Sequence, residues 1–447
     1  MQASGGIMKI YTKRLVFDEK IEKTESLLDA VEDFLRKSLP GNSDFLRYAI
    51  VEVEGDQKTI EVALIKDSDE IQKCDLRRTT IAPGIDDGGK KFVVANIVPT
   101  GVRAEIGGWI GDATPATNVL AEISDYVITH PNVLNAAFLN YGRDNVLYTE
   151  GYHLDQFFSK RTALRELLTS KRHNRIGVIL DRGAIEEDKE SINIAINTIE
   201  SLRAVGGIEV TDYVITDDPV GGRAVRMKSG AFCGEVKNPQ AFLKPAEELI
   251  KKGAQAIAIA TYISISMDDL DAYFRGEIPN PYGGTEALIS HTISKAFKIP
   301  AAHGPILSKE EKERMTAKGL VDPRAASEVV SPGYLGSVLR GLHQSPHPVD
   351  PSFLAPNDIT LNDVNAIIVP YTCCGGIPVL AAQKNNIIVI AVKENRTVLN
   401  VTPEKLGLNN VIVAENFLEA FGIISTIKAG VSLSSVRRPI HRIKEKI

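Results

Sequence analysis

The sequence predicts an α/β protein with mainly parallel, doubly wound sheets and a small N-terminal α+β domain. From about residue 91 onward, short continuous apolar runs alternate with amphipathic helices. Strands that are apolar on both faces and separated by helices are typical of a parallel sheet that is covered on both sides. Before that point, the order is strand, helix and hairpin. The 447 residues, 43% of them hydrophobic, suffice for two or three domains with substantial cores.

The N-terminal domain is predicted to span residues 1–90. Residues 8–17 should form a strand and residues 26–39 an amphipathic helix. A hairpin should follow, with strands at 45–53 and 59–66 around the turn "EGDQ". The boundary is expected near Lys90, because "RRTTIAPGIDDGGKK" combines proline, paired aspartates and glycines, which favour an exposed linker.

Residues 91–447 are predicted to form the α/β part and to carry the ligand site. Helices are expected between the strands, for example at 189–205 and 238–252. Residues 306–360 are polar and contain several prolines, so they are expected to leave the sheet as an excursion or lid, or to form an oligomer contact. Strands are expected at 92–100, 126–133, 175–181, 210–216, 254–263, 365–372, 387–395 and 410–416.

Charge and cysteine content exclude several classes of protein. The formal net charge of −5 gives no electrostatic reason to bind nucleic acid or a membrane surface. The four cysteines are too few and too scattered for a disulfide framework, and they lack the spacing of a structural zinc site. "HQSPHP" carries a proline between its histidines, so no metal site is predicted. The chain should be soluble and cytoplasmic, with a homo-oligomer as an open possibility.

Three glycine pairs precede predicted helices, in "IGGWIGDATPATNVLAEI", "YGGTEALISHTISKAF" and "CCGGIPVLAAQKNN". Glycines leave the backbone N–H groups of a helix N-terminus uncovered, and the helix dipole there favours an anion. The alternative is ordinary turn and helix-capping chemistry, especially for Thr285. The predicted anion-binding residues are Arg103, Gly107, Gly108, Asp112, Gly284, Thr285, Glu286, Gly375 and Gly376.

The first of these segments, in the loop 99–115, carries no nucleotide fingerprint. It has neither GxxxxGK[ST] nor the spacing of GxGxxG, so the cofactor stays unknown. Arg223 lies in the basic segment "DPVGGRAVRMKSGAF" and is a further candidate for binding a phosphorylated or carboxylated ligand, with a solvated hairpin as the alternative.

Two histidines are candidates for general acid/base catalysis. His130 in "VITHPNV" and His303 in "AAHGP" each follow an apolar run, so both are expected at the carboxyl end of a strand. Open α/β sheets place their ligands at that edge. His291 lies two turns into a predicted helix and is expected to be an ordinary core or surface residue.

Cys373 and Cys374 lie between the predicted strand 365–372 and the helix that begins near Gly376. A helix N-terminus lowers a thiol pKa, so either cysteine could act as a nucleophile or proton acceptor. The alternative is that both are small packing residues.

The phrases "ITHPNVLN" and "ENRTVLNVTP", together with "NIVPTGVRAEIGGWIGDATP" and "PYGGTEALISH", carry a family resemblance. They resemble a family of uncharacterised proteins from cyanobacteria and archaea that is classed as a domain of unknown function, and the resemblance spans roughly Lys91 to Ala429. It implies no activity. Glu394, Asn395 and Arg396 lie in the second phrase, and their chemistry suits a ligand site.

These observations predict an enzyme that acts on a small anionic metabolite, either carboxylated or phosphorylated. The glycine-rich loops would bind the anion, and the histidines or cysteines would supply acid/base or thiol chemistry. The alternative is a non-catalytic metabolite-binding or assembly protein.

Overall fold

The computed structural model describes residues 8–18, 26–40, 43–66, 91–108, 112–134, 142–167, 173–316, 319–330, 334–440 and 442. The strands are β1 Lys9–Phe17, β2 Ser43–Glu54, β3 Gln57–Lys66, β4 Val93–Asn96, β5 Tyr126–Thr129, β6 Val146–Tyr148, β7 Ala163–Arg165, β8 Ile176–Leu180, β9 Val210–Ile215, β10 Gly222–Arg226, β11 Phe232–Val236, β12 Ala256–Ser264, β13 Ala301–Ile306, β14 His347–Val349, β15 Val364–Pro370, β16 Ile388–Val392 and β17 Val411–Ala414. The α-helices are α1 Leu27–Ser38, α2 Thr114–Ile123, α3 Gly151–Phe158, α4 Arg182–Glu187, α5 Lys189–Gly206, α6 Gln240–Lys251, α7 Met267–Phe274, α8 Gly283–Phe297, α9 Lys309–Thr316, α10 Ala326–Val330, α11 Tyr334–His343, α12 Ile377–Lys384, α13 Pro403–Leu406, α14 Phe417–Lys428 and α15 Leu433–Val436.

The N-terminal elements form as predicted: β1, α1, and the hairpin of β2 and β3. Ser26 caps α1 by accepting a hydrogen bond from the Asp29 N–H, and the antiparallel order of the strands is β2-β3-β1. β1 also pairs antiparallel with β11, so these strands continue into a sheet of the following part of the chain. The predicted linker before Lys90 lies outside the described residues.

A six-stranded sheet is parallel throughout, in the order β17-β16-β15-β4-β5-β6. The order therefore reverses between β4 and β15, the two central strands. Both faces are buried: Val93 and Ala95 of β4 belong to one apolar core with residues of α3 and α12, and Val94 belongs to another with residues of α2 and α14. The predicted α/β class is confirmed at this level, because parallel strands alternate with covering helices.

A second parallel group has the order β9-β8-β12-β13. Between β9 and β12 the chain forms the antiparallel hairpin of β10 and β11, and β10 also pairs with the end of β12. Through this hairpin the second group joins the N-terminal strands in one mixed sheet. α8 crosses this part of the molecule and is buried along most of its length.

The chain between β13 and β15 leaves the parallel sheets, as the sequence suggests. It forms α9, α10, α11 and the strand β14, which pairs with β7. Within the parts of the chain that the structure describes, no helix has both the length and the apolar composition needed to span a membrane.

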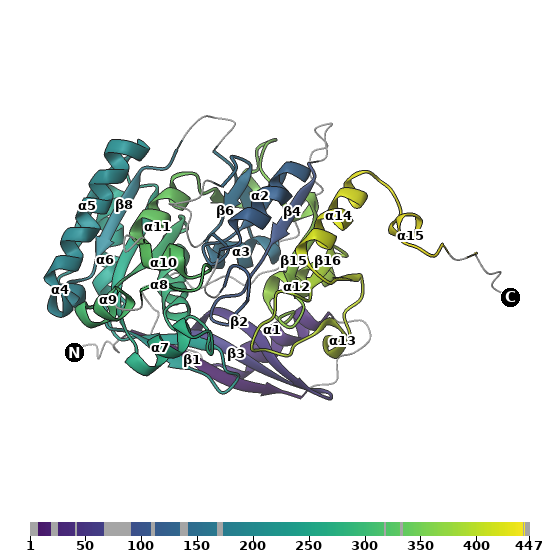
Figure 1. The fold of residues 1–447 in the computed structure, drawn as a ribbon, viewed down its shortest axis with the longest axis horizontal. Coiled ribbons are helices and arrows are strands. Elements are labelled where there is room, and N and C mark those ends of the chain that lie inside the picture. Colours follow the sequence, from purple (N-terminus) through teal and green to yellow (C-terminus); the bar gives the residue numbers. More distant parts are fainter. Residues whose placement is uncertain are drawn as a thin grey trace.

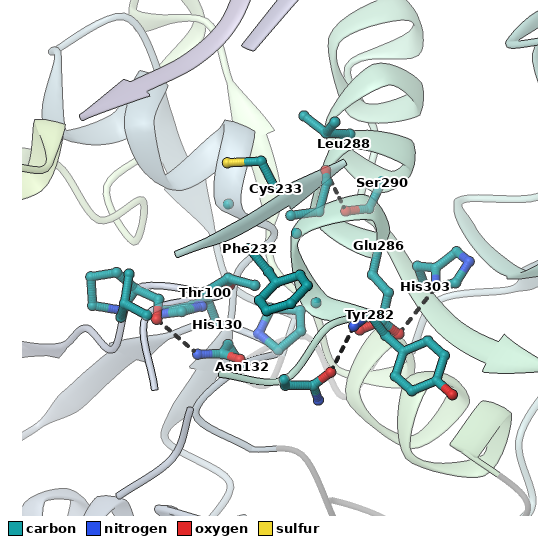
Figure 2. A pocket seen from close by; sticks show the side chains of 18 of the residues that line it. Thr100, His130, Asn132, Phe232, Cys233, Tyr282, Glu286, Leu288, Ser290 and His303 are labelled. Atoms are coloured by element: carbon teal, nitrogen blue, oxygen red, sulfur yellow. Dashed lines mark hydrogen bonds and ion pairs between the residues drawn. The ribbon is translucent and has the colours of Figure 1, made fainter. Parts of the chain in front are cut away.

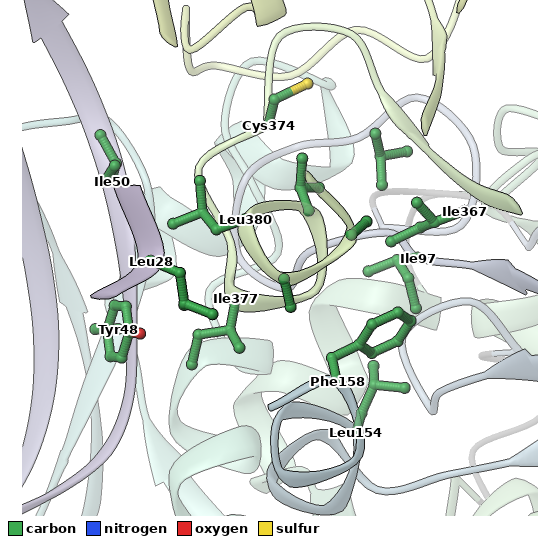
Figure 3. Close-up of a cluster of buried hydrophobic side chains, with 14 of the residues drawn as sticks. Leu28, Tyr48, Ile50, Ile97, Leu154, Phe158, Ile367, Cys374, Ile377 and Leu380 are labelled. Atoms are coloured by element: carbon green, nitrogen blue, oxygen red, sulfur yellow. The ribbon is translucent and has the colours of Figure 1, made fainter. Parts of the chain in front are cut away.

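Three groups of strands therefore meet around the centre of the molecule (Figure 1). The N-terminal strands lie along the lower edge of the view, the group with β8 on the left, and the six-stranded sheet on the right. Figure 3 shows how α12 joins two of them: Ile377 and Leu380 lie between Tyr48 and Ile50 of β2 on one side and Ile367 of β15 on the other. Burial of these side chains holds the N-terminal strands against the six-stranded sheet.

Candidate functional site

A cavity of about 280 Å³ lies where the three groups of strands meet. Ile97, Pro99 and Thr100 follow β4 and line it, as do Cys373 and Gly376, which follow β15. The cavity therefore borders the carboxyl ends of the two strands between which the sheet order reverses, the place where open α/β sheets bind ligands. Figure 2 shows His130 and Asn132 on one side of the cavity and Glu286 with His303 on the other.

The N-terminal part of α8 faces the start of α3 across one wall of this cavity. His291 of α8 forms an ion pair through Nδ1 with a side-chain oxygen of Glu150, and both side chains are buried. Glu150 is the N-cap of α3 and also accepts hydrogen bonds from the N–H of Tyr152 (2.7 Å) and from the Ser290 hydroxyl (3.2 Å). Burial alone would raise the pKa of Glu150, but the charge and hydrogen bond of His291, the charge of His153 and the Tyr152 N–H lower it, so the side chain is held as a carboxylate.

This carboxylate orients His291 for proton transfer. Nε2 of His291 has no hydrogen-bond partner among the described residues, and His291 lines the cavity. The ring packs so closely on Gly151 that a Cβ atom there would lie 2.5 Å from Cε1 and 3.0 Å from Nε2. A carboxylate on one nitrogen and a free second nitrogen is the arrangement of a histidine general base.

Arg47 of β2 also lines the cavity. It makes no hydrogen bond or ion pair with another described residue, although its positive charge acts on His130, Asp155 and Cys373. A guanidinium without a carboxylate partner, at a cavity wall, is a ready site for a carboxylate or phosphate.

Asp155 lies on α3, one turn after Gly151, and faces the same cavity. Burial raises the pKa of Asp155 to about 7, against the lowering effect of the Arg47 charge. A carboxyl group with this pKa exchanges its proton readily near neutral pH.

His303 lines the cavity, but its place in the strand differs from the prediction. It lies in the middle of β13, paired with Ile259 of β12, because the strand continues through Gly304 and Pro305 to Ile306. Among the described strands β13 pairs only with β12, and an edge strand tolerates a proline.

Both ring nitrogens of His303 are occupied by protein groups. Nδ1 lies 3.2 Å from Oε1 of Glu286, and Nε2 lies 2.9 Å from the Thr261 hydroxyl. His303 therefore orients Glu286. The carboxylate of Glu286, rather than the His303 ring, is the group of this pair that a ligand in the cavity can contact.

His130 follows β5 directly and lines the cavity. Its Nε2 accepts a hydrogen bond from the Val98 N–H (3.1 Å), and burial lowers the pKa of His130 to about 3. The ring is therefore neutral at pH 7, with its proton on Nδ1, and it can donate a hydrogen bond rather than act as a base.

The two adjacent cysteines have environments opposite to those of a reactive thiolate. Burial raises the pKa of Cys373 to about 12 and raises that of Cys374 as well, so the expected lowering by the helix N-terminus is wrong. The desolvation of both sulfurs outweighs the dipole of the short helix α12. Cys373 lines the cavity, whereas Cys374 packs in the apolar core (Figure 3).

The predicted glycines act mainly as points of close packing. A Cβ atom on Gly284 would lie 2.5 Å from the Phe232 carbonyl oxygen of β11, and one on Gly375 would lie 2.0 Å from the Ile50 carbonyl oxygen of β2. The Gly284 contact packs α8 against β11, and the Gly375 contact packs the segment before α12 against β2. Gly284 and Gly376 also line the cavity, together with Glu286, His130, His303 and Cys373 among the predicted site residues.

The other predicted binding residues lie outside the cavity. Arg103 donates to the Gly276 carbonyl (2.8 Å), Arg223 pairs with Glu235 on the exposed hairpin, and Asn395 bonds the backbone of Ile106. The residues outside the cavity are Arg103, Gly107, Gly108, Asp112, Arg223, Thr285, Cys374, Gly375, Glu394, Asn395 and Arg396.

Thr285 is not the N-cap of its helix. α8 begins two residues earlier at Gly283, and the Thr285 hydroxyl donates instead to the Arg223 carbonyl (3.1 Å). Tyr282 is the capping position, and its N–H donates to the side chain of Asn280 (2.9 Å). The residue with the best capping side chain is therefore not the cap, because tertiary packing starts the helix earlier.

Sequence reasoning missed Arg47, Glu150 and Asp155 and treated His291 as an ordinary residue. Two features of the sequence point to Arg47 and Glu150. Arg47 interrupts the apolar run "FLRYAIVEV", and Glu150 follows the apolar run "NVLYT", at the carboxyl end of β6. Among the described residues, no group of three or more His, Cys, Asp or Glu side chains is arranged to hold a metal ion.

Comparison with known proteins identifies the family. Residues 93–437 match the sequence family described as "Protein of unknown function (DUF3326)". The chain is also 35% identical over 348 residues to a protein of the cyanobacterium Synechococcus named as an uncharacterized lipoprotein, and this match covers 77% of the chain and 92% of the relative. No solved structure matches. The resemblance to a cyanobacterial family is confirmed, and its archaeal members stay a prediction. The chain belongs to the DUF3326 family.

Proposed function

We propose that the protein is an enzyme that binds a small carboxylated or phosphorylated metabolite in the central cavity and transfers a proton to or from it. One observation carries this proposal: the pair of Glu150 and His291 lines the same cavity as Arg47, which has no ion-pair partner among the described residues. A base with an orienting carboxylate and a separate anion site are the minimum for acid/base chemistry on an anionic substrate.

The roles follow from the contacts. Arg47 binds the anionic group of the substrate, and Nε2 of His291 takes a proton from a neighbouring atom of the substrate while Glu150 stabilises the imidazolium that forms. Neutral His130 donates a hydrogen bond to an oxygen on which negative charge develops. Asp155, with its pKa raised to about 7, can return a proton.

The experiment begins with a ligand screen. Thermal-shift assays against small mono- and dicarboxylates and phosphorylated metabolites identify binders, and each binder is then incubated with the protein in D2O. Loss of a substrate C–H signal in proton NMR spectra reports proton abstraction whatever product the reaction forms. We expect exchange with the wild-type protein at neutral pH.

Two variants and one control separate the roles. His291→Asn should lower the exchange rate at least about 100-fold and leave binding within a few fold, whereas Arg47→Met should weaken binding itself. His347→Asn is the control, because His347 is a partly buried histidine that contacts Asn174 outside the central cavity. Binding that depends on Arg47 without any exchange would favour the non-catalytic metabolite-binding protein.

We also propose that the six-stranded sheet is doubly wound. The reversal of strand order between β4 and β15 and the helices in the cores on both faces support this description. An experimental structure with a bound ligand tests both the description and the cavity.

We also propose that the protein is soluble and cytoplasmic, without a nucleic-acid or membrane partner, and leave the homo-oligomer as an open possibility. The three described cysteines are free thiols, which supports a reducing compartment. Cell fractionation and size-exclusion chromatography test the location and the oligomeric state.

A further inference from the structure

Two carboxylate side chains that act electrostatically on the same part of the cavity form what we call its acidic end. Glu286 of α8 and Glu328 of α10 both line the cavity and act on one another as like charges. Glu328 accepts hydrogen bonds from the Tyr273 hydroxyl, at 2.9 Å to each of its oxygens. The charged groups that act on Glu328 are the carboxylates of Glu286 and Asp112, and no described cation pairs with it. Burial raises the pKa of Glu328 to about 7.

Aromatic side chains surround these two carboxylates. Tyr273, Phe274, Tyr282 and Tyr334 all line the cavity, and the Glu328 and Glu286 charges both act on Tyr273 and Tyr334. Carboxylates among aromatic rings form a favourable environment for an ammonium or guanidinium group, because ion pairing and cation–π attraction act together.

The charge of Arg47 acts on a different set of side chains from the carboxylates of the acidic end. The Arg47 charge acts on Asp155, Cys233 and Cys373, whereas it is not among the charges that act on Glu328. A purely anionic ligand that filled the cavity would bring negative charge against two carboxylates, which is unfavourable in a buried site.

We propose that the ligand is bipolar: a small molecule with a carboxylate or phosphate for Arg47 and an amine or guanidine, in its protonated form, for Glu286 and Glu328. This inference rests on the proposed function, since it uses the same cavity and the same anion site. It narrows the substrate class from anionic metabolites to amino acids and related amino-phosphate compounds. The cavity volume of about 280 Å³ suits a molecule of that size.

The test compares matched straight-chain probes with three to six carbons. At each length, calorimetry measures the dicarboxylate, the diamine and the ω-amino acid, so that only the charges of the two ends differ. The wild-type protein should bind one of the ω-amino acids at least tenfold more tightly than the dicarboxylate and the diamine of the same length.

Substitutions test which residues bind each charged end of the ligand. Glu328→Gln should weaken binding of the ω-amino acid at least tenfold and leave or improve binding of the dicarboxylate, and Arg47→Met should weaken both. Glu286→Gln is a second variant for the acidic end, and Glu248→Gln is the control because Glu248 is exposed and outside the cavity. Circular dichroism and thermal unfolding establish that each variant folds.

Different results would contradict the bipolar ligand and the proposed function. Dicarboxylate binding that depends on Arg47, with no preference for any ω-amino acid, would overturn the bipolar ligand and leave the proposed function standing. If Arg47→Met changes the binding of no probe and of no compound in the wider ligand screen, both proposals are wrong.

Discussion

His291 shows how one residue gains a chemical role from its surroundings. On the helix alone it is an ordinary histidine, but Glu150 fixes one ring nitrogen and Gly151 allows the ring to lie against α3. His130 and His303 were the better candidates by position in the sequence. The contacts of His130 with Val98, and of His303 with Thr261 and Glu286, occupy the nitrogens that they would need as bases.

The cysteines give a prediction for single side chains. With its pKa raised to about 12, Cys373 should carry roughly 10³-fold less thiolate at pH 7.5 than an ordinary cysteine. We expect slow iodoacetamide labelling of Cys373 and Cys374 in the folded protein and fast labelling in denaturant, with site assignment by mass spectrometry. Labelling of either cysteine in the folded protein at the denatured rate would contradict the burial described above.

Asp155 predicts a pH-dependent stability. Its folded pKa of about 7 lies above the unfolded value of about 3.9, so the unfolded state releases its proton first and the stability due to this residue falls as pH rises from about 4 to 7. Asp155→Asn should therefore stabilise the protein by about 2 kcal/mol more at pH 8 than at pH 5, measured by denaturant unfolding.

The control for Asp155 is an exposed aspartate. Asp212→Asn should give no such gain, because Lys252 lowers the pKa of Asp212. Equal effects of Asp155→Asn at both pH values would show that Asp155 is ionised in the folded protein at both.

Among the secondary-structure elements, glycines determine how α12 and α8 approach the neighbouring strands. Gly375 precedes α12, and its carbonyl accepts a hydrogen bond from the Ile50 N–H of β2 (3.0 Å), while Gly376 pairs with Ala49 as an isolated bridge. The glycine pair that suggests an anion cradle in the sequence therefore contributes mainly to the docking of two elements.

This packing predicts different outcomes for adjacent substitutions. Gly375→Ala should destabilise the protein by about 3 kcal/mol or more, because its Cβ would lie 2.0 Å from the Ile50 carbonyl oxygen. Gly376→Ala should cost at most about 1 kcal/mol, because its nearest neighbour would be the Pro378 ring at 3.7 Å. Thermal and denaturant unfolding of the two variants measure the difference, and equal losses would rule out this close approach.

Across the whole molecule, ion pairs hold the N-terminal strands over the cavity. Lys295 of α8 is buried and contacts Asp44 (2.5 Å) and the Phe45 carbonyl (3.0 Å) of β2, the strand that carries Arg47. Because α8 carries His291 and Glu286, this contact fixes the base and the anion site relative to one another.

Removing the buried positive charge of Lys295 should lower the stability of the protein. Lys295→Met should destabilise the protein by about 3 kcal/mol, because it removes one charge of a buried pair with Asp44, and it should weaken binding of the anionic probes that depend on Arg47. Lys384→Met removes a more exposed pair with Asp29 of α1 and should cost about 0.5 kcal/mol. If the two variants unfold at the same denaturant concentration, the buried contact does not hold the N-terminal strands.

The local elements and the class of fold could be predicted from the amino-acid sequence alone. Apolar runs marked the parallel strands, and amphipathic patterns marked helices such as α1, α5 and α6. Each of these depends on neighbours within a few residues, which are visible in the sequence.

Contacts between distant elements, in contrast, determine which side chains share the cavity and which of their groups are protonated or free to react. Arg47, Glu150 and His291 come from elements far apart in the chain, and only His291 lies in one of the segments with a glycine pair, two turns into its helix. Their roles depend on burial and on the partner that each side chain meets across elements. Burial raises the pKa of a cysteine that the helix dipole was expected to lower, and a free nitrogen is what distinguishes His291 from His303 among the described residues. Both properties come from contacts between elements, so residue type and spacing along the chain do not determine them.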